Sequence, residues 1–235
     1  MTGRSGGPVG ANVEAVRARI VAAAERAGRD PAAVTLVAAT KTVDAARVAE
    51  VVLAGVTDVG ENRAQELVAK APLVAAHLEA AHVVAEPEGR IGAPAWHFLG
   101  ALQRNKVRSA ATWVSCWESV DRVALGGAIA RHAPGAHVFA EVNLGTEEQK
   151  PGCPPEAVGD LCRALRDLGL HVDGLMAVPP RDDDPRPWFA ALRTLGQDLG
   201  LAGLSMGMSD DFEIAVEEGA TAVRVGRAIF GDRPD

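Results

Sequence analysis

The chain has 235 residues and a hydrophobic content of 48%, which suits one complete α/β barrel and leaves no room for a second domain. Its net charge is −7 and no cluster of Lys and Arg recurs on one predicted face, which excludes a nucleic-acid or anionic-membrane partner. The cysteines are odd in number and lack metal-ligand spacing, and neither a signal core nor a bilayer-spanning run is present. We therefore expect a cytoplasmic protein without a metal site.

In chain order, the first predicted element is an amphipathic helix over residues 12–27, which Gly28 ends. Eight apolar runs of strand length follow, and they predict strands at residues 34–39, 57–60, 96–99, 112–116, 137–142, 172–178, 203–206 and 221–225. The amphipathic stretches between them predict helices at residues 44–54, 63–70, 103–109, 119–132, 156–168, 187–199 and 210–217, with a short helical segment at 227–230.

This alternation of eight strands with helices indicates an α/β fold, a (β/α)8 TIM barrel with an extra N-terminal helix. We expect one barrel domain over residues 12–235, preceded by a flexible tail at residues 1–11. Two segments rich in Pro, Gly or Asp, residues 86–95 and 179–187, are predicted loops. Neither suggests a domain boundary.

Residues 203–231 predict two successive strand-to-helix turns that suit an anion. Ser209 stands where a helix N-cap belongs, with Asp210 and Asp211 in the first turn, and Gly226 opens directly into the segment 227–230. In a parallel barrel the loops after strands 7 and 8 often hold phosphate at helix N-termini. The alternative is that Ser209 only caps its own helix. The two aspartates would repel a phosphate unless they lie on the outer side of the helix.

Lys41 comes directly after the apolar run VTLVAAT, at the carboxyl end of the first predicted strand. Apolar barrel surroundings would lower the pKa of its ammonium group, as Schiff-base chemistry with an aldehyde requires. The structural alternative is that Lys41 reaches the barrel rim and pairs with a carboxylate such as that of Glu61.

Lys41 and the two anion turns come from strands 1, 7 and 8, which are neighbours in a closed barrel. An aldehyde and a phosphate on one small aromatic ring describe pyridoxal phosphate. Arg224, two residues before Gly226, would face that ring. Because an arginine donates hydrogen bonds and keeps its protons, the ring nitrogen would stay unprotonated and the ring would be a weaker electron sink. This pattern predicts a site that holds the cofactor better than it exploits it.

These residues belong to a set of motifs that closely resembles the pyridoxal phosphate homeostasis proteins, single-domain relatives of the alanine racemase barrel. The resemblance covers nearly the whole chain. Its motifs are LVAATKT around Lys41, GENRAQE at 60–66, WHFLGALQRNK at 96–106, EVNLGTEEQKPG at 141–152, GLMAVPP at 174–180, and the SMGMSDDFE and VRVGRAIFG blocks near the end. Two departures concern loop shape: Asp44 and Ala45 stand where members often have a proline, and the insertion at 80–95 is long.

The resemblance implies a fold-type III barrel that binds pyridoxal 5′-phosphate (PLP). Lys41 would be the aldimine lysine and Arg224 the partner of the pyridine nitrogen. Members are understood as binders that buffer or deliver the cofactor in the cell, so PLP-dependent apo-enzymes and amino acids are the further partners it implies. We expect a monomer or a weak dimer. The phosphate cup would consist of Ser209 and the backbone amides of Gly226 and Arg227, with Ser205 nearby.

Other polar residues near the predicted strand ends have two interpretations each. Asn62 contacts the cofactor, or it forms a helix-capping pair with Gln65. His97 is a proton carrier beside the cofactor, or a hydrogen-bonded core residue within an apolar strand. We expect Asn143 and Met176 to line the pocket.

The leading hypothesis is a non-catalytic PLP carrier, and the alternative is an amino-acid racemase on the same barrel. A racemase needs a second acid or base opposite the lysine, for which related enzymes use a tyrosine from a partner subunit. This chain contains no tyrosine, although His97 or Cys116 could replace it. A third class, a barrel enzyme acting on a sugar phosphate through a lysine imine, leaves Arg224 unexplained.

Overall fold

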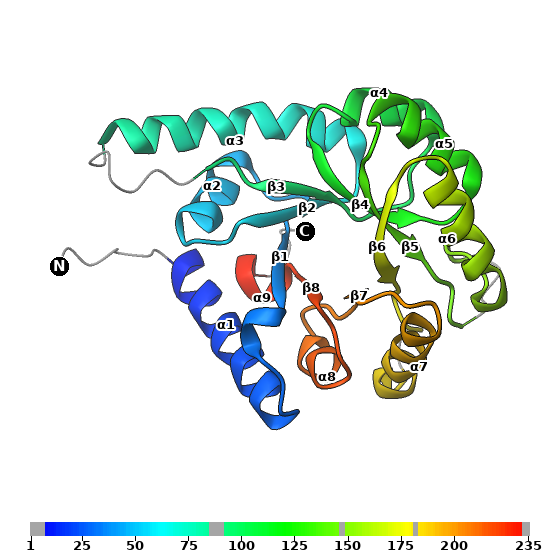
Figure 1. The fold of residues 1–235 in the computed structure, drawn as a ribbon. Coiled ribbons are helices and arrows are strands. Elements are labelled where there is room, and N and C mark those ends of the chain that lie inside the picture. The colour runs from blue at the N-terminus through cyan, green and yellow to red at the C-terminus, as the bar shows by residue number, and fades with distance from the viewer. Residues whose placement is uncertain (1–7, 85–91, 146–148, 181–182, 232–235) are drawn as a thin grey trace.

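The computed structural model describes residues 8–84, 92–145, 149–180 and 183–231. Eight parallel strands pair in sequence order and close into a barrel, with helices arranged around its outside (Figure 1). The predicted TIM barrel is therefore confirmed. Among the described helices, none combines the length and apolar character needed to cross a membrane.

The strands agree with the predicted runs to within a few residues, apart from the fourth. They are β1 (Thr35–Ala39), β2 (Asp58–Glu61), β3 (Ala95–Phe98), β4 (Val114–Val120), β5 (His137–Glu141), β6 (His171–Met176), β7 (Gly203–Ser205) and β8 (Ala222–Val225). The α-helices are α1 (Pro8–Arg26), α2 (Ala45–Leu53), α3 (Ala64–Val84), α4 (Val107–Ala110), α5 (Val123–His132), α6 (Val158–Asp167), α7 (Pro185–Asp198), α8 (Phe212–Glu217) and α9 (Arg227–Phe230). Short 3₁₀ turns are η1 (Pro31–Ala33), η3 (Arg104–Lys106) and η4 (Pro155–Ala157).

Aspartate side chains define the start of two barrel helices. Asp44 accepts a hydrogen bond from the backbone N–H of Arg47 at 2.9 Å and begins α2. Asp184 accepts from the N–H of Arg186 at 3.0 Å and begins α7, whose first residue is a proline. Both contacts satisfy amide groups that a helix leaves unpaired in its first turn. The helix that carries the chain away from Lys41 thus begins at a defined residue.

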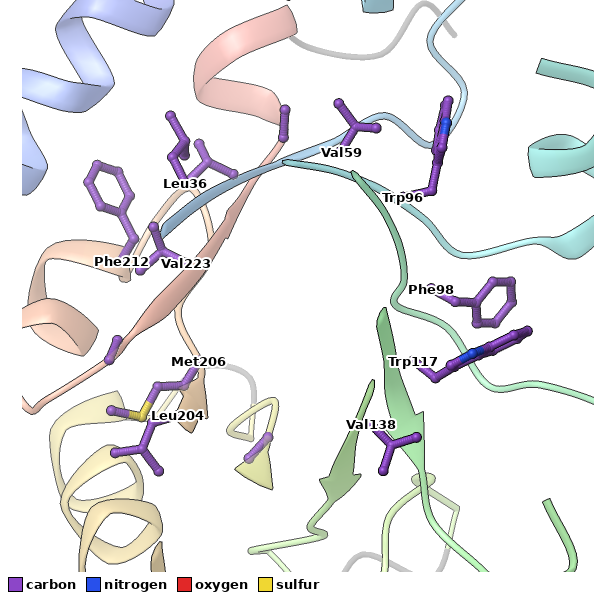
Figure 2. Packing of buried hydrophobic residues seen from close by; sticks show 14 of the residues in the cluster. Leu36, Val59, Trp96, Phe98, Trp117, Val138, Leu204, Met206, Phe212 and Val223 are labelled. Atoms are coloured by element: carbon purple, nitrogen blue, oxygen red, sulfur yellow. The ribbon is translucent and has the colours of Figure 1, made fainter. Parts of the chain in front are cut away.

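The main apolar core lies between the strands and the helix layer. Alternate strand residues such as Val59, Trp96, Phe98, Trp117 and Val138 are buried there, and Figure 2 shows part of this cluster. Because strand side chains alternate between two faces, the residues next to these point into the barrel interior.

The barrel interior contains a small apolar cluster and a set of polar side chains. Cys116, Phe139 and Met176, from β4, β5 and β6, form the apolar cluster. Glu118 of β4 hydrogen-bonds to Ser205 of β7. These strands are not adjacent in the barrel, so their side chains meet across its interior.

The additional N-terminal helix α1 packs against α8, α9 and α2 on the outside of the barrel (Figure 1). Its Asn12 side chain donates to the carbonyl of Ile229 in α9 at 2.8 Å. Helix α1 therefore supports the short helix at the second anion turn. It begins at Pro8, earlier than the predicted residue 12, and residues 1–7 of the predicted tail lie outside the described residues.

The predicted boundary between β4 and the next helix was wrong. Strand β4 continues to Val120 and α5 begins only at Val123, whereas the sequence suggested a strand end at 116 and a helix from 119. The predicted helix began at Ser119, yet Glu118 and Ser119 are both buried residues of the strand. A polar residue can continue a strand when the barrel interior supplies its partners.

Helix α3 is longer than predicted. It runs from Ala64 through Pro72 to Val84, instead of stopping at residue 70. Ala71, Val74 and Leu78 are buried at helical spacing, and this packing continues the helix beyond the proline. The first part of the insertion at 80–95 is consequently helical. Residues 85–91 of that insertion and residues 181–182 of the loop at 179–187 lie outside the described residues.

Candidate functional site

Lys41 follows β1 at the carboxyl end of the barrel and is half-buried. The residues on both sides of it are held in place. Thr40 is fully buried and donates from its backbone N–H to the carbonyl of Gly60 at 2.8 Å. Thr42 has a positive φ of 65° and donates from its N–H to Glu66 at 2.6 Å. The backbone therefore presents Lys41 at a defined position on the barrel mouth.

A buried ion pair next to this turn involves a different lysine. Lys70 of α3 binds the Glu61 carboxylate, and its ammonium also donates to the carbonyl of Thr40 at 2.7 Å. Glu61 also accepts from the Thr40 hydroxyl at 2.8 Å. Burial raises the pKa of Glu61, although Lys70 and Thr40 act in the opposite direction. Glu61, which the sequence suggested as a rim partner of Lys41, thus forms its ion pair with Lys70.

The two anion turns after β7 and β8 meet as predicted. The Ser209 hydroxyl accepts hydrogen bonds from the backbone N–H groups of Gly226, at 3.3 Å, and Ala228, at 3.2 Å. A Cβ at Gly226 would lie 3.0 Å from the carbonyl oxygen of Ala39 in β1, so the turn lies close against the strand that leads to Lys41. These amides open α9 next to β1, at the position where the sequence predicts an anion site.

The interpretation of Ser209 as a cap of its own helix was wrong. Helix α8 begins at Phe212 with Asp211 in the N-cap position, and the Ser209 hydroxyl contacts the first turn of α9 instead. Asp211 accepts from the N–H of Met208 at 2.6 Å. Asp210 is exposed and pairs with the side chain of Arg227, so the side chains of Asp210 and Arg227 lie on the outer side of the turn.

Arg224 points from β8 into the barrel interior and is 5% exposed. Its guanidinium donates from Nη1 to the Ser205 hydroxyl at 2.7 Å and from Nη2 to the carbonyl of Ala177 at 3.0 Å. The same Nη1 lies 4.0 Å from the Glu118 carboxylate. Burial lowers the pKa of Arg224, against the effect of the carboxylates of Glu118, Glu141 and Asp211. Arginine stays protonated under these conditions and remains a pure donor.

His97 lies on β3, and carboxylates occupy both of its ring nitrogens. Nδ1 is 2.5 Å from Glu118 and Nε2 is 3.0 Å from Asp58. Burial acts to lower the pKa of His97, but the contacts with Asp58, Cys116 and Glu118 outweigh it and raise that pKa to about 12. Burial likewise acts to raise the pKa of Glu118, yet His97, Arg224 and Ser205 hold it below its usual range. These contacts favour the imidazolium form of His97, and Glu118 connects it to Ser205 and Arg224.

His97, Cys116 and Glu118 also resemble the ligand set of a metal site, with one donor atom each within 4.8 Å of the others. A tetrahedral zinc ion with bonds of about 2.0 to 2.3 Å would separate its ligands by more than about 3 Å. The 2.5 Å between His97 Nδ1 and Glu118 Oε1 is a hydrogen-bond distance. Burial raises the pKa of the Cys116 thiol, which disfavours the thiolate that a metal needs. The cluster is a hydrogen-bonded network.

Three buried polar atoms near the carboxyl ends of β2 and β5 have no hydrogen-bond partner within the described part of the chain. They are Oε2 of Glu61, Oδ1 of Asn62 and Oε2 of Glu141. The proposed capping role of Asn62 is therefore wrong, while a role toward a ligand agrees with an open acceptor. Burial and the Asp121 carboxylate raise the pKa of Glu141 to about 7, and Arg224 opposes this shift.

The remaining predicted pocket residues lie near the same end of the barrel. Met176 is 1% exposed and packs with Cys116 and Phe139 below the mouth. Asn143 follows β5, and its side chain donates to the carbonyl of Lys150 at 3.4 Å. Met176 thus lies in the barrel interior and Asn143 in the loop after β5, and a contact of either with a ligand stays a prediction.

The sequence analysis missed Asp58, Glu118 and Glu141. Asp58 and Glu141 stand at the start and the end of predicted strands, where charged residues are common. The signal that could have identified Glu118 is its alternation with Cys116 and Val114 on one strand face.

Several known proteins are similar to this chain. The sequence model of the alanine racemase N-terminal domain matches residues 11–234. A pyridoxal phosphate homeostasis protein from Pseudomonas aeruginosa is 41% identical over 232 residues, which cover 94% of this chain and 94% of that protein. Its counterpart from Aquifex aeolicus is 39% identical over 230 residues, 92% of this chain and 94% of the relative.

Solved structures show the same relationship. The structure of PipY from Synechococcus elongatus with PLP bound has a TM-score of 0.73 and 31% identity, covering 92% of this chain and 100% of that one. An unknown protein from Bifidobacterium adolescentis has a TM-score of 0.83 and 36% identity, over 95% of this chain and 94% of that one.

Proposed function

Because the chain belongs to the pyridoxal phosphate homeostasis proteins, within the alanine racemase N-terminal domain family, we propose that it binds PLP and acts in intracellular PLP homeostasis. The observation that carries the proposal is the position of Lys41 at the end of β1, against which the Gly226 turn is packed. PLP has an aldehyde that condenses with a primary amine and a phosphate that suits a helix N-terminus.

The residues at the mouth fit PLP on three counts. The N–H groups of Gly226 and Ala228 already donate to an oxygen, that of Ser209, so they can donate to a phosphate oxygen in its place or beside it. A Cβ at position 226 would lie 3.0 Å from the carbonyl oxygen of Ala39, so a glycine there lets the turn pack closely against the strand that leads to Lys41. The open acceptor of Asn62 supplies a polar contact on the side of β2.

Within this proposal each residue has one task. Lys41 supplies the amine, the α9 turn holds the phosphate, and Arg224 donates a hydrogen bond toward the ring nitrogen. Since Arg224 has no proton to release, it does not convert that nitrogen into a pyridinium, which would strengthen the ring as an electron sink. We therefore propose a carrier that holds and releases the cofactor without a reaction of its own.

We propose PLP-dependent apo-enzymes as recipients and amino acids as amines that displace Lys41, with the protein acting as a monomer or weak dimer. A cytoplasmic location is part of the proposal, and it is supported by the three cysteines, which are all free thiols as in a reducing compartment.

One observation favours the alternative, an amino-acid racemase. Glu141 is 6% exposed, has an open carboxylate oxygen, and stands on β5, the strand opposite β1 in the barrel. A carboxyl with a pKa of about 7 suits an acid or base that opposes Lys41. Proton exchange at the α-carbon of a bound amino acid separates the two functions.

The test of the proposal is the absorption spectrum of the purified protein with PLP before and after borohydride reduction, followed by mass mapping of the modified lysine. We expect the label on Lys41 and its loss in Lys41→Ala. Lys106→Ala is the matched control and should keep the label on Lys41. Labelling mainly at Lys70, Lys106 or Lys150 would contradict the assignment.

A further inference from the structure

A continuous chain of hydrogen bonds crosses the barrel interior and ends on Arg224. It runs from Asp58 on β2 to His97 on β3 at 3.0 Å, and from His97 to Glu118 on β4 at 2.5 Å. It continues from Glu118 to Ser205 on β7 at 2.5 Å and from Ser205 to Arg224 on β8 at 2.7 Å. We call these five residues the interior relay. The relay connects five of the eight strands.

The chemistry of the relay defines where each proton lies. Arg224 can only donate, so the Ser205 oxygen must be the acceptor of that bond. The Ser205 hydroxyl then has its own proton free for Glu118, which as a carboxylate can only accept. The second oxygen of Glu118 accepts from His97, whose other nitrogen donates to Asp58. Within the relay, neither the Ser205 hydroxyl nor the His97 ring can change the direction of its hydrogen bonds without breaking one of them.

The charges of the relay balance. The carboxylates of Asp58 and Glu118 face the imidazolium of His97 and the guanidinium of Arg224, and Glu118 lies between the two cations. Arg224 is 5% exposed and Glu118 is fully buried, so either charge alone would be strongly unfavourable in this interior. The guanidinium of Arg224 is held in place by its hydrogen bonds to Ser205 and Ala177 and by the nearby Glu118 carboxylate.

We propose that Glu118 is a positioning residue that, together with His97 and Ser205, fixes the orientation of the Arg224 guanidinium toward the ligand pocket. The inference rests on the proposed function only in that PLP is taken as the ligand of Arg224. Its structural part is that the guanidinium of Arg224 is immobilised and His97 is charged, and this part applies also to the protein without a ligand. These two parts are tested separately.

The first experiment uses the apo protein and nuclear magnetic resonance of the histidine and arginine side chains, with His97→Gln to assign the ring signals. We expect both ring nitrogens of His97 to carry protons at pH 8, and the side-chain N–H protons of Arg224 to exchange slowly with water. Neutral His97 at pH 8 together with fast exchange at Arg224 would overturn the proposal without any use of PLP.

The second experiment compares Glu118→Gln and Ser205→Ala with Ser119→Ala. A glutamine has one side-chain oxygen to serve both His97 and Ser205, so one of the two donors loses its acceptor. Ser205→Ala removes the bridge while all charged groups remain. Ser119 is the matched control, because it is buried on the same strand as Glu118 and donates at 2.5 Å to the carbonyl of Gly100, outside the relay.

We expect Glu118→Gln and Ser205→Ala to speed the exchange of the Arg224 protons and to weaken PLP binding about tenfold, since a charge-assisted contact is lost. The pH below which the ring nitrogen of bound PLP takes up a proton, followed by absorption, should rise in both variants, because a ring nitrogen freed from the Arg224 cation is a stronger base. Ser119→Ala should leave all three measurements unchanged.

Unchanged exchange, affinity and absorption in both relay variants would overturn the proposal. If Glu118→Gln does not fold, Ser205→Ala and the wild-type measurements still decide it. If the wild-type protein takes up no PLP at all, the proposed function fails, while the apo-protein spectra continue to test the relay.

Discussion

The Ser209 hydroxyl, in the loop after β7, accepts a hydrogen bond from the backbone N–H of Gly226 at the start of α9. These residues are 17 positions apart in sequence, and their contact joins the turn after β7 to the turn after β8. The N–H groups there are oriented by a single oxygen before any ligand arrives. Such preorganisation lowers the conformational cost of binding a phosphate.

A first prediction concerns these two turns. Ser209→Ala should weaken PLP binding modestly, because one hydrogen bond to a charged group contributes about 1.5 to 3 kcal/mol and water replaces part of it. Gly226→Val should weaken binding more, since a side chain there meets the carbonyl of Ala39 and closes the turn. Fluorescence titration with PLP and with pyridoxal measures both effects. The control is Ser109→Ala, an exposed serine of α4. Equal affinities for pyridoxal and PLP in the wild type would refute the phosphate site.

A second prediction concerns the pH dependence of stability through Glu141. Its pKa rises from 4.5 in the unfolded chain to about 7 in the folded protein, where it faces Asp121 and Arg224. The folded state therefore binds this proton more tightly, and the resulting stabilisation is complete below pH 4.5 and lost as the pH rises through about 7.

Replacing the Glu141 carboxyl by an amide removes the loss of stability that accompanies its ionisation. Glu141→Gln should gain up to about 3 kcal/mol relative to the wild type between pH 4.5 and pH 8. Urea unfolding at several pH values measures the difference. Glu50→Gln, on the exposed face of α2, is the control and should parallel the wild type. A Glu141→Gln curve parallel to the wild type would show that Glu141 does not titrate in this range.

A third prediction concerns the buried pair of Lys70 and Glu61 beside Lys41. Lys70→Met leaves the Glu61 carboxylate buried without its cation, which should cost about 3 to 5 kcal/mol of unfolding free energy. The double variant Lys70→Met with Glu61→Gln should recover much of that loss, because no charge is then buried.

A double-mutant cycle by urea unfolding measures the coupling between these two residues. Arg163→Ala, which breaks an exposed ion pair with Asp160, is the control and should change stability by less than about 0.5 kcal/mol. A Lys70→Met variant as stable as Arg163→Ala would contradict the prediction.

A fourth prediction concerns catalysis. The PLP-loaded protein should exchange the α-proton of common amino acids at a rate far below that of a racemase, because Arg224 leaves the ring nitrogen unprotonated and the chain has no tyrosine. Deuterium incorporation at the α-carbon detects proton removal even when no net product forms. Rapid exchange with inversion that is lost in both Lys41→Ala and Glu141→Gln would support the racemase instead.

The amino-acid sequence determined the barrel and indicated the residues proposed for its site. Strands and helices follow from the local alternation of apolar and polar residues, so all eight strands were predictable, and α9 was predicted to the residue. Lys41 and the Gly226 turn could be placed together because the carboxyl ends of parallel strands share one face of a barrel. The family motifs indicate PLP as the ligand.

Only the tertiary structure decided how the polar residues are paired. Ser209 contacts α9 instead of capping α8, and Glu118 lies inside a strand that was predicted to end at residue 116. The partners in the interior relay are separated by 19 to 87 positions in sequence. Whether a polar side chain points inward is decided by the groups that barrel closure places opposite it, and local sequence patterns carry no information about those distant groups.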